Sequence, residues 1–491
     1  MSDPQVASTA ATEEADGFRS LFQVEERGIE AVPPAEQTSR PKELFWIWFA
    51  GNISILGLPL GIWVVAGVLN IWQALLATVI GSVGSFAIVG LVSIAGQRGG
   101  APSLTLSRAT FGVIGNFFPT LVAIVSRWGW ETVNTVTAAF AIISIGSIIT
   151  GRDLLPSDAP IVAVAAVLAF LLLTLAVSGL GHKTLAAVQQ WATYLFGALT
   201  LVIVVALAFR IDWQVVFSAE SGPVSAILIA IGTVAAGTGI AWANSGADLG
   251  RYQSPSVKPS RLVSASAFGA GIPLVIMIGM GSLIAITEPN FDPSNPLAAI
   301  PALLPPWMSI PFLLAAFFGL LMSNNISVYS SGLTLLTLGI KTRRFYAVML
   351  ELVASFVGSM LFLFVFANFY DAFIGFITLL AVPLVAWLAV FLLDMIKRTR
   401  YDSEALLVMG PTSRYWYRGG VEWRALAAWF IGIVAGYSLR LDALADSWLA
   451  ANGLDWALTM VVTAVAYLVF GGLTSTKLAR DLPGRGDRTH A

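Results

Sequence analysis

The sequence predicts an all-α integral membrane protein of about twelve transmembrane helices. Hydrophobic residues make up 57% of the 491 positions and charged residues only 11%, whereas soluble domains carry roughly 25% charged residues. Mean hydropathy is +0.81. The apolar residues also gather into runs of roughly 20 residues or more, the length that crosses a hydrocarbon core. We therefore expect the lipid bilayer to be the solvent for most of the chain.

Twelve apolar runs define the expected spans, and short polar stretches separate them. In chain order they cover residues 45 to 68, 72 to 97, 113 to 148, 158 to 179, 184 to 209, 223 to 249, 262 to 287, 306 to 337, 345 to 366, 369 to 393, 424 to 439 and 456 to 474. Residues 1 to 43 precede the first span and contain no apolar run typical of a signal peptide. We expect this segment to be a tail.

The distribution of cations predicts the orientation, because short cytoplasmic loops are enriched in Lys and Arg. If the chain starts inside, 23 of its 27 Lys and Arg residues fall on the cytoplasmic side. Arg152, Arg210 and Arg440 fall outside, and Arg127 lies within the third span. We therefore expect a multi-pass protein of the cell membrane with both termini in the cytoplasm.

Several classes of function are disfavoured by what the sequence lacks. The net charge is −1, so nothing indicates a nucleic-acid partner. There is no cysteine, and the two histidines are His182 in a short connection and His490 near the C-terminus. No HExxH, GxSxG or P-loop motif is present. We expect neither an enzyme nor a bound cofactor.

Two spans are interrupted by glycine. The first reads FWIWFAGNISILGLPLGIWVV and the sixth reads AAGTGIAWANSGADLGRY. Glycines could simply allow close helix packing, but interrupted helices at matching places in two halves mark transporter binding sites. Freed backbone groups are tolerated at membrane depth where they face protein or a wet cavity. The breaks are five helices apart, which predicts an inverted repeat.

This repeat divides the chain into five expected segments. They are a tail over 1 to 43, a first five-helix repeat over 44 to 210, a second over 223 to 393, two additional helices over 424 to 475, and a tail over 476 to 491.

The third span contains the densest polar cluster, SRWGWETVNT. Ionised groups at the bilayer centre are costly, so Arg127 and Glu131 need partners or water. They could pair with each other, being one turn apart. Alternatively, Trp130 offers a flat face to an aromatic ring while Glu131 and Asn134 offer hydrogen bonds. Both readings can hold together, and a carboxyl within a span is also a candidate proton carrier.

The eighth span carries a second polar cluster, SNNIS, with Ser323, Asn324, Asn325 and Ser327. Such side chains could join helices. The hydrogen-bonding groups of two adjacent amides are hard to satisfy in a water-free helix interface, because each amide has two donors and an acceptor with two lone pairs. A water-filled cavity is the simpler explanation. At the end of the sixth span, we expect Asp248 and Arg251 to form a structural pair or a gate.

With these motifs in order, the chain resembles the nucleobase–cation symport family, in particular its purine–cytosine permease branch. The resemblance runs through RGIEAVPPAE, FWIWFAGNIS, GWETVN, GADLGRY and SNNISVYSSGL. It implies a LeuT-type 5+5 inverted repeat with two additional C-terminal helices. It implies a base lying against Trp130, with further contacts at Asn134, Gly237, Thr238, Gly239, Ala241 and Asn324.

The resemblance also implies a candidate sodium site, formed by Gly51 and Ser54 of the first helix and by Gly319, Met322 and Ser323 of the eighth. Two positions depart from the family. Met322 stands where sodium-coupled relatives have a hydroxyl, which favours proton coupling through Glu131 with Arg127 nearby. Gly239 stands where several relatives have an aromatic, so either Trp242 substitutes for it or the pocket is wider.

The sequence thus predicts a secondary active transporter that imports a purine or cytosine-like base by symport with H⁺ or Na⁺. The alternative substrate is another planar heterocycle, such as allantoin, a hydantoin, thiamine or a pyridine vitamin. An alternative of another class is a channel or a non-transporting sensor. The exact base, the ion, its stoichiometry and the oligomeric state stay open.

Overall fold

The computed structural model describes residues 24–65, 68–288, 296–365 and 369–472. These residues form helices and connections, with two isolated β-bridges and no strand among them. Each of the twelve expected spans falls on helical structure. In the described ranges, nine helices are long and apolar enough to cross a membrane, and a bent pair makes a tenth. The all-α membrane fold is confirmed.

The helices of the first half run from residue 41 to residue 218. They are α2 (Pro41–Asn52), α3 (Gly57–Val65), α4 (Ile71–Val79), η1 (Ile80–Gly84), α5 (Ser85–Gly99), α6 (Ser103–Phe111), α7 (Phe117–Thr150), α8 (Pro160–Ser178), α9 (His182–Ala208) and α10 (Trp213–Ser218).

The helices of the second half begin at residue 224. They are α11 (Val224–Ala235), η2 (Ala236–Ile240), η3 (Ala243–Ser245), α12 (Gly246–Gly250), α13 (Pro259–Thr287), α14 (Pro296–Leu303), α15 (Pro306–Thr337), α16 (Arg344–Phe364), α17 (Phe369–Lys397), α18 (Ser403–Leu407), α19 (Trp423–Ser438), α20 (Asp442–Ala445), α21 (Trp448–Ala451) and α22 (Asp455–Val469).

The first expected span is broken. Helices α2 and α3 meet at an angle of 69°, and the connection between them contains Ser54. Close packing explains part of its glycine content: a Cβ on Gly61 would lie 2.0 Å from the Ile278 carbonyl oxygen of α13, and one on Gly281 would lie 2.0 Å from the Leu58 carbonyl oxygen. Glycine therefore permits the close contact between α3 and α13 as well as the interruption of the span.

The sixth expected span is also irregular, because α11 passes through the π-helical turn η2 and the 3₁₀ turn η3 before α12. Thr238 has φ −124° and ψ −108°, outside the helical region. The Ser85 side chain holds this point, since its hydroxyl accepts a hydrogen bond from the Gly239 N–H at 3.1 Å and lies 3.3 Å from the Thr238 hydroxyl. Both predicted interruptions are therefore present.

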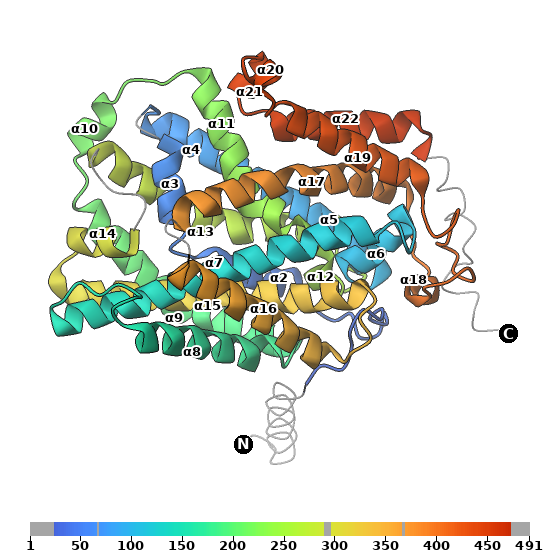
Figure 1. Ribbon diagram of the computed structural model, residues 1–491, viewed down its shortest axis with the longest axis horizontal. Helices are drawn as coiled ribbons and strands as arrows, with labels where there is room; N and C mark the ends of the chain where they lie inside the picture. The colour runs from blue at the N-terminus through green and yellow to red at the C-terminus, as the bar shows by residue number, and fades with distance from the viewer. Residues whose placement is uncertain (1–23, 66–67, 289–295, 366–368, 473–491) are drawn as a thin grey trace, which may run out of the picture.

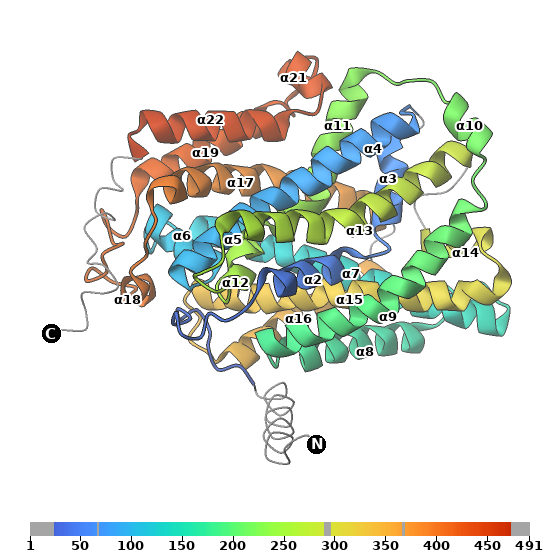
Figure 2. The ribbon, with the colours of Figure 1, turned by 180° about the vertical axis from the view of Figure 1, so that it is seen from behind.

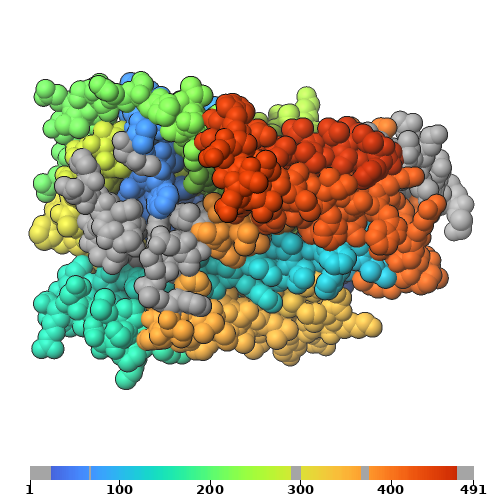
Figure 3. All heavy atoms as spheres, turned by 45° about the horizontal axis from the view of Figure 1, so that its top comes forward, coloured from blue at the N-terminus to red at the C-terminus, as the bar shows by residue number. Residues whose placement is uncertain are grey.

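The long helices α7 and α15 pack along each other near the middle of the molecule (Figures 1 and 2). Helices α8, α9 and α16 lie along one side of this pair. Helices α19 and α22 pack against each other and against α17 on another side, and their red and orange atoms cover a continuous part of the face in Figure 3. At 16 and 15 residues, these two helices are shorter than the other expected spans.

The outer faces of the helices are apolar. Leu172 of α8 is 65% exposed, and Trp191 of α9 is 73% exposed. Polar side chains are instead buried in the interior, as Asn134, Asn324 and Glu131 illustrate at no more than 1% exposure. This inverted arrangement suits a protein surrounded by hydrocarbon, where polar groups must find partners inside the bundle.

Candidate functional site

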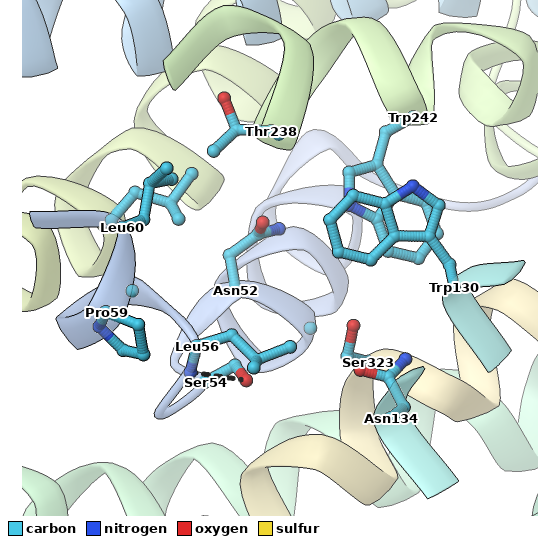
Figure 4. Close-up of a pocket in the computed structure, with 14 residues that line it drawn as sticks. Asn52, Ser54, Leu56, Pro59, Leu60, Trp130, Asn134, Thr238, Trp242 and Ser323 are labelled. Carbon is cyan, nitrogen blue, oxygen red and sulfur yellow. Dashed lines mark hydrogen bonds between the residues drawn. The ribbon is translucent and has the colours of Figure 1, made fainter. Parts of the chain in front are cut away.

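A cavity opens where the two broken spans face α7 and α15. It has about 740 Å³ of space, which includes the open solvent at its mouth. Figure 4 shows side chains from both breaks projecting into it. The lining residues are Gly51, Asn52, Ser54, Leu56, Gly57, Pro59, Leu60, Trp130, Asn134, Gly237, Thr238, Trp242, Leu274 and Ser323.

Two tryptophans supply the aromatic surface. Trp130 projects from α7, and Trp242 follows the η2 turn; the two indoles lie on the same side of the view in Figure 4. Two neighbouring side chains hold the ring of Trp242 in place. It makes an edge contact with Trp48 at 5.6 Å between centroids, and the Arg127 guanidinium lies 4.6 Å from its centroid.

An unpaired amide oxygen belongs to the same cavity. Asn134 lies one helical turn after Trp130 on α7 and is 1% exposed, and its Oδ1 has no hydrogen-bond partner. A buried acceptor without a donor costs free energy, so this atom is poised to accept a hydrogen bond from a ligand. Asn52, in contrast, is anchored, because its Nδ2 donates to the Trp48 carbonyl at 2.8 Å.

Four of the predicted substrate contacts therefore line the cavity: Trp130, Asn134, Gly237 and Thr238. Gly239 does not, because it faces α5, where an added Cβ would lie 2.4 Å from the Ser85 backbone. Trp242 lines the cavity, whereas Ala241 next to it is buried outside the lining.

Asn324 and Glu131 also lie outside the cavity lining. The Asn324 amide points toward α8, where its Nδ2 donates to the Thr174 hydroxyl at 3.2 Å. The Glu131 carboxylate points toward α15 and α16, and it accepts hydrogen bonds from Ser327 at 3.1 Å and Ser355 at 2.9 Å. Sequence spacing does not tell in which direction the Asn324 and Glu131 side chains point, because both residues lie within one or two positions of cavity residues.

Arg127 does not form the expected ion pair with Glu131 among the described residues. Its guanidinium instead donates to the Asn244 side-chain oxygen and the Ser245 hydroxyl. Arg127 thus ties α7 to the second break. The direct Arg127–Glu131 ion pair, one of the two interpretations that the sequence left open, is therefore not formed, because a partner 117 residues away takes the same guanidinium. Glu131 still lies near enough to attract Arg127.

The five residues of the candidate sodium site lie near the first break. Gly51, Ser54 and Ser323 line the cavity. Gly319 faces the break, since a Cβ there would lie 2.9 Å from the Ile53 carbonyl oxygen. The Met322 side chain is buried in an apolar cluster, and its carbonyl accepts a hydrogen bond from Gln189 at 2.7 Å. The two serines supply hard oxygen, whereas the Met322 thioether is soft.

The expected pair of Asp248 and Arg251 is likewise not formed. Asp248 accepts hydrogen bonds from the Ser103 N–H at 2.8 Å and from the Ser330 hydroxyl. Arg251 instead forms an ion pair with Glu25 of the N-terminal segment at 3.3 Å. The expectation of a local pair is wrong because both groups find partners from distant parts of the chain.

Sequence reasoning missed several cavity residues. Asn52 and Leu274 were not singled out, although an amide within the interrupted first span was a usable signal for Asn52. Leu60 and Leu274 had none, because an apolar side chain within an apolar span looks the same whether it faces lipid, protein or a cavity.

Comparisons with known proteins identify the family and the fold. Residues 31–469 match the family model described as permease for cytosine/purines, uracil, thiamine, allantoin. YxlA, a Bacillus subtilis (strain 168) protein provisionally named a purine-cytosine permease, is 27% identical over 467 residues, which cover 91% of this chain and 96% of that protein.

Solved structures share the fold. Mhp1, a nucleobase-cation-symport-1 family transporter in a closed conformation with bromovinylhydantoin bound, is 18% identical with a TM-score of 0.73, covering 94% of this chain and 97% of that one. Inward-facing Mhp1 is 17% identical and gives 0.68, over 92% and 95%. A Na⁺-coupled sialic acid symporter is 13% identical and gives 0.59, over 89% and 91%.

These neighbours confirm the architecture that the two breaks predicted. The family match spans the broken helices, the cavity and the C-terminal helices, and its members are permeases, not enzymes. The chain therefore belongs to the family of permeases for cytosine/purines, uracil, thiamine and allantoin, with the fold of the nucleobase–cation symporters.

Proposed function

We propose that this protein imports a purine or cytosine-like base together with a cation by alternating access. The observation that carries the proposal is the cavity between the two broken spans, where two indoles adjoin the unpaired Oδ1 of Asn134. An indole offers a face for stacking a planar ring. The amide oxygen offers an acceptor for a ring N–H or an exocyclic amine.

The same features suit another planar heterocycle. The matching family model includes thiamine and allantoin in its description, and an amide oxygen beside two indoles does not by itself select a base. Shape and edge chemistry would then decide the substrate. This alternative keeps the transport mechanism and changes only the cargo.

The coupling cation in this proposal is a proton, with Glu131 as its carrier and Arg127 one turn earlier. Sodium is the alternative, held by carbonyl and hydroxyl oxygens among Gly51, Ser54, Gly319 and Ser323. The thioether of Met322 would not serve a hard alkali ion, which is why we favour the proton.

We further propose that the protein lies in the cell membrane with both termini in the cytoplasm, as the distribution of Lys and Arg predicts. The two repeats, 44 to 210 and 223 to 393, would then move relative to each other around the cavity. The family and fold support this arrangement, since broken helices at matching positions meet at the cavity.

A thermal-shift screen of the purified protein tests the proposal, because a ligand that binds the folded state stabilises it by mass action. The probes are cytosine, adenine, hypoxanthine, uracil, allantoin and thiamine, each with sodium and with choline. We expect saturable stabilisation by a purine or by cytosine. Stabilisation by allantoin or thiamine alone would replace the base with the alternative cargo, and no stabilisation by any probe would contradict both.

A further inference from the structure

A second buried polar cluster lies between α7, α15 and α16. It contains two carboxyl groups, Glu131 of α7 and Glu351 of α16, and both side chains are 0% exposed. Three serines from α15 and α16 surround them. Helices α7, α15 and α16 pack against one another, so the two acids share one enclosed space within the bundle.

The two carboxyl groups have different hydrogen-bond partners. Both oxygens of Glu131 accept hydrogen bonds, from Ser327 at 3.1 Å and from Ser355 at 2.9 Å. Glu351 Oε2 accepts one from the Trp128 indole, but Glu351 Oε1 has no partner although it is fully buried. Ser331, one turn after Ser327 on α15, lies near both acids, and its hydroxyl donates to the Val328 carbonyl at 3.3 Å.

The charges nearby do not balance two carboxylates. Arg127 is the cation close to Glu131, and it also faces Asp248 of α12. Helix α8 contributes no titratable side chain and α15 only Tyr329, which bonds to Arg251 and Tyr252. Two like charges sharing a buried site cannot both persist at low cost. One of the two acids therefore needs a proton.

Donors on both oxygens favour the ionised form of a carboxyl group, whereas a buried oxygen that receives no hydrogen bond disfavours it. We propose that Glu131 and Glu351 form one proton-binding site, in which Glu351 Oε1 carries the proton in this conformation and Glu131 is the carboxylate. This inference rests on the proposed cation symport and identifies Glu351 as a residue of its coupling site.

The site is placed to communicate with the cavity through two helices. Glu131 directly follows Trp130 on α7, and Ser327 lies one turn after Ser323 on α15; Trp130 and Ser323 both line the cavity. A shift of α7 against α15 on base binding would change the separation of the two acids. One proton would then bind and leave with each transport cycle.

The first test measures protonation directly and needs no substrate. Infrared difference spectra of purified protein, titrated from acid to alkaline pH, should contain the carbonyl stretch of one protonated carboxyl at neutral pH. Glu351→Gln should remove this band, while Glu220→Gln, the same change at an exposed position, should keep it. An unchanged band in Glu351→Gln would overturn the proposal whatever the substrate is.

The second test uses reconstituted vesicles and separates coupling from binding. We expect Glu351→Gln and Glu131→Gln to lose at least tenfold of the accumulation of labelled base driven by a pH gradient, yet to retain base counterflow. Loss in Glu131→Gln alone would overturn the shared site. Accumulation driven by sodium and insensitive to pH would overturn proton coupling, while wild-type counterflow would still support base transport.

If Glu351→Gln does not fold, Glu351→Asp provides the decisive variant. It keeps a carboxyl group but shortens it by one methylene, so the infrared band should persist at a shifted frequency and midpoint. A band identical to that of the wild-type protein would place the proton elsewhere and overturn the proposal.

Discussion

Trp130 and Trp242 form the cavity wall in different ways. Trp130 stands on the regular helix α7, whereas Trp242 stands just after the irregular turn at Thr238 and is fixed by Trp48 and Arg127. A fixed indole loses little conformational entropy when a ring binds to it. We therefore propose that Trp242 provides a preorganised wall for a bound ring and that Trp130 provides a second stacking face.

Replacing Trp130 by alanine should weaken base binding and leave folded protein in the membrane. Stacking of a base on an aromatic side chain contributes roughly 1 to 3 kcal/mol, so affinity should fall about 5- to 150-fold. Equilibrium binding of labelled base measures this change. Trp191→Ala on the lipid-facing side of α9 is the matched control, and equal affinities in both variants would remove Trp130 from the site.

Asn134→Ala tests the unpaired oxygen. Loss of one hydrogen bond between neutral groups costs about 0.5 to 1.5 kcal/mol, or about 2- to 13-fold in affinity. The comparison variant is Asn324→Ala, because the Asn324 amide bonds to Thr174 outside the cavity lining. Geometry predicts a larger binding loss for Asn134→Ala. The opposite ranking in the same assay would restore Asn324 as the polar contact implied by the family resemblance.

The N-terminal segment that begins at residue 24 is bound to the helices more firmly than the expected tail would be. The Glu25 carboxylate lies 3.3 Å from the Arg251 guanidinium and 3.9 Å from the Arg344 guanidinium. Its oxygens also accept hydrogen bonds from the Tyr252 hydroxyl and from the His182 N–H. Burial opposes ionisation of Glu25, but the two arginines outweigh it and hold the pKa of this carboxyl below its usual value of 4.5. The segment thus joins the ends of α9, α12 and α16.

Glu25→Gln should lower the thermal stability of the protein at neutral pH. Because the pKa of Glu25 is lowered in the folded state, its stabilisation is complete above about pH 4.5 and disappears as pH falls through the lowered value. Removing a charged hydrogen-bond acceptor costs about 1 to 3 kcal/mol. Thermal shifts at pH 7 and at acid pH measure this difference.

Glu36→Gln is the control for Glu25→Gln, since Glu36 pairs with Arg27 at an exposed position where side chains are 58% and 28% accessible and such pairs contribute little. The wild-type protein and Glu25→Gln should converge on acidification. A constant gap at every pH would show that the carboxylate charge is not what binds the segment.

Elements were predictable from sequence where hydropathy alone decides them. The runs at residues 306 to 337 and 158 to 179 became α15 and α8 because any long apolar run in lipid must satisfy its backbone as a helix. The two breaks were predictable because glycines interrupted those runs at matching places. Helix α19 (Trp423–Ser438) agrees with the expected span at 424 to 439, whereas α22 ends at Val469, within the expected span at 456 to 474, since helix ends at the membrane surface depend on neighbours as well as on hydropathy.

The partners of polar side chains could not be predicted in the same way. Arg127 and Glu131 are neighbours on one helix, yet Arg127 turns to Asn244 and Glu131 to Ser355. These choices depend on which helices pack beside α7. Glu25 and Glu351 had no motif to mark them, because a lone glutamate becomes informative only when its surroundings are known.

The net charge that crosses the membrane with each base determines how strongly the membrane potential drives transport. A neutral base carries no charge, so any dependence on membrane potential comes from the cation and from charged groups that move with it. One elementary charge moving through about 100 mV gains about 2.3 kcal/mol. This free energy corresponds to roughly 50-fold accumulation of the base at equilibrium.

Vesicles that contain the protein should therefore concentrate labelled base when a potassium diffusion potential makes their interior negative. With a pH-neutral buffer and choline in place of sodium, a potential of about 100 mV should support up to ~50-fold accumulation if one proton accompanies each base. A protonophore should collapse a base gradient driven by a pH difference, and adding sodium should change neither rate nor extent. Accumulation that requires sodium would instead assign the ion to the region of Ser54 and Ser323. Base equilibration that ignores both potential and pH would contradict symport and leave a channel as the remaining explanation.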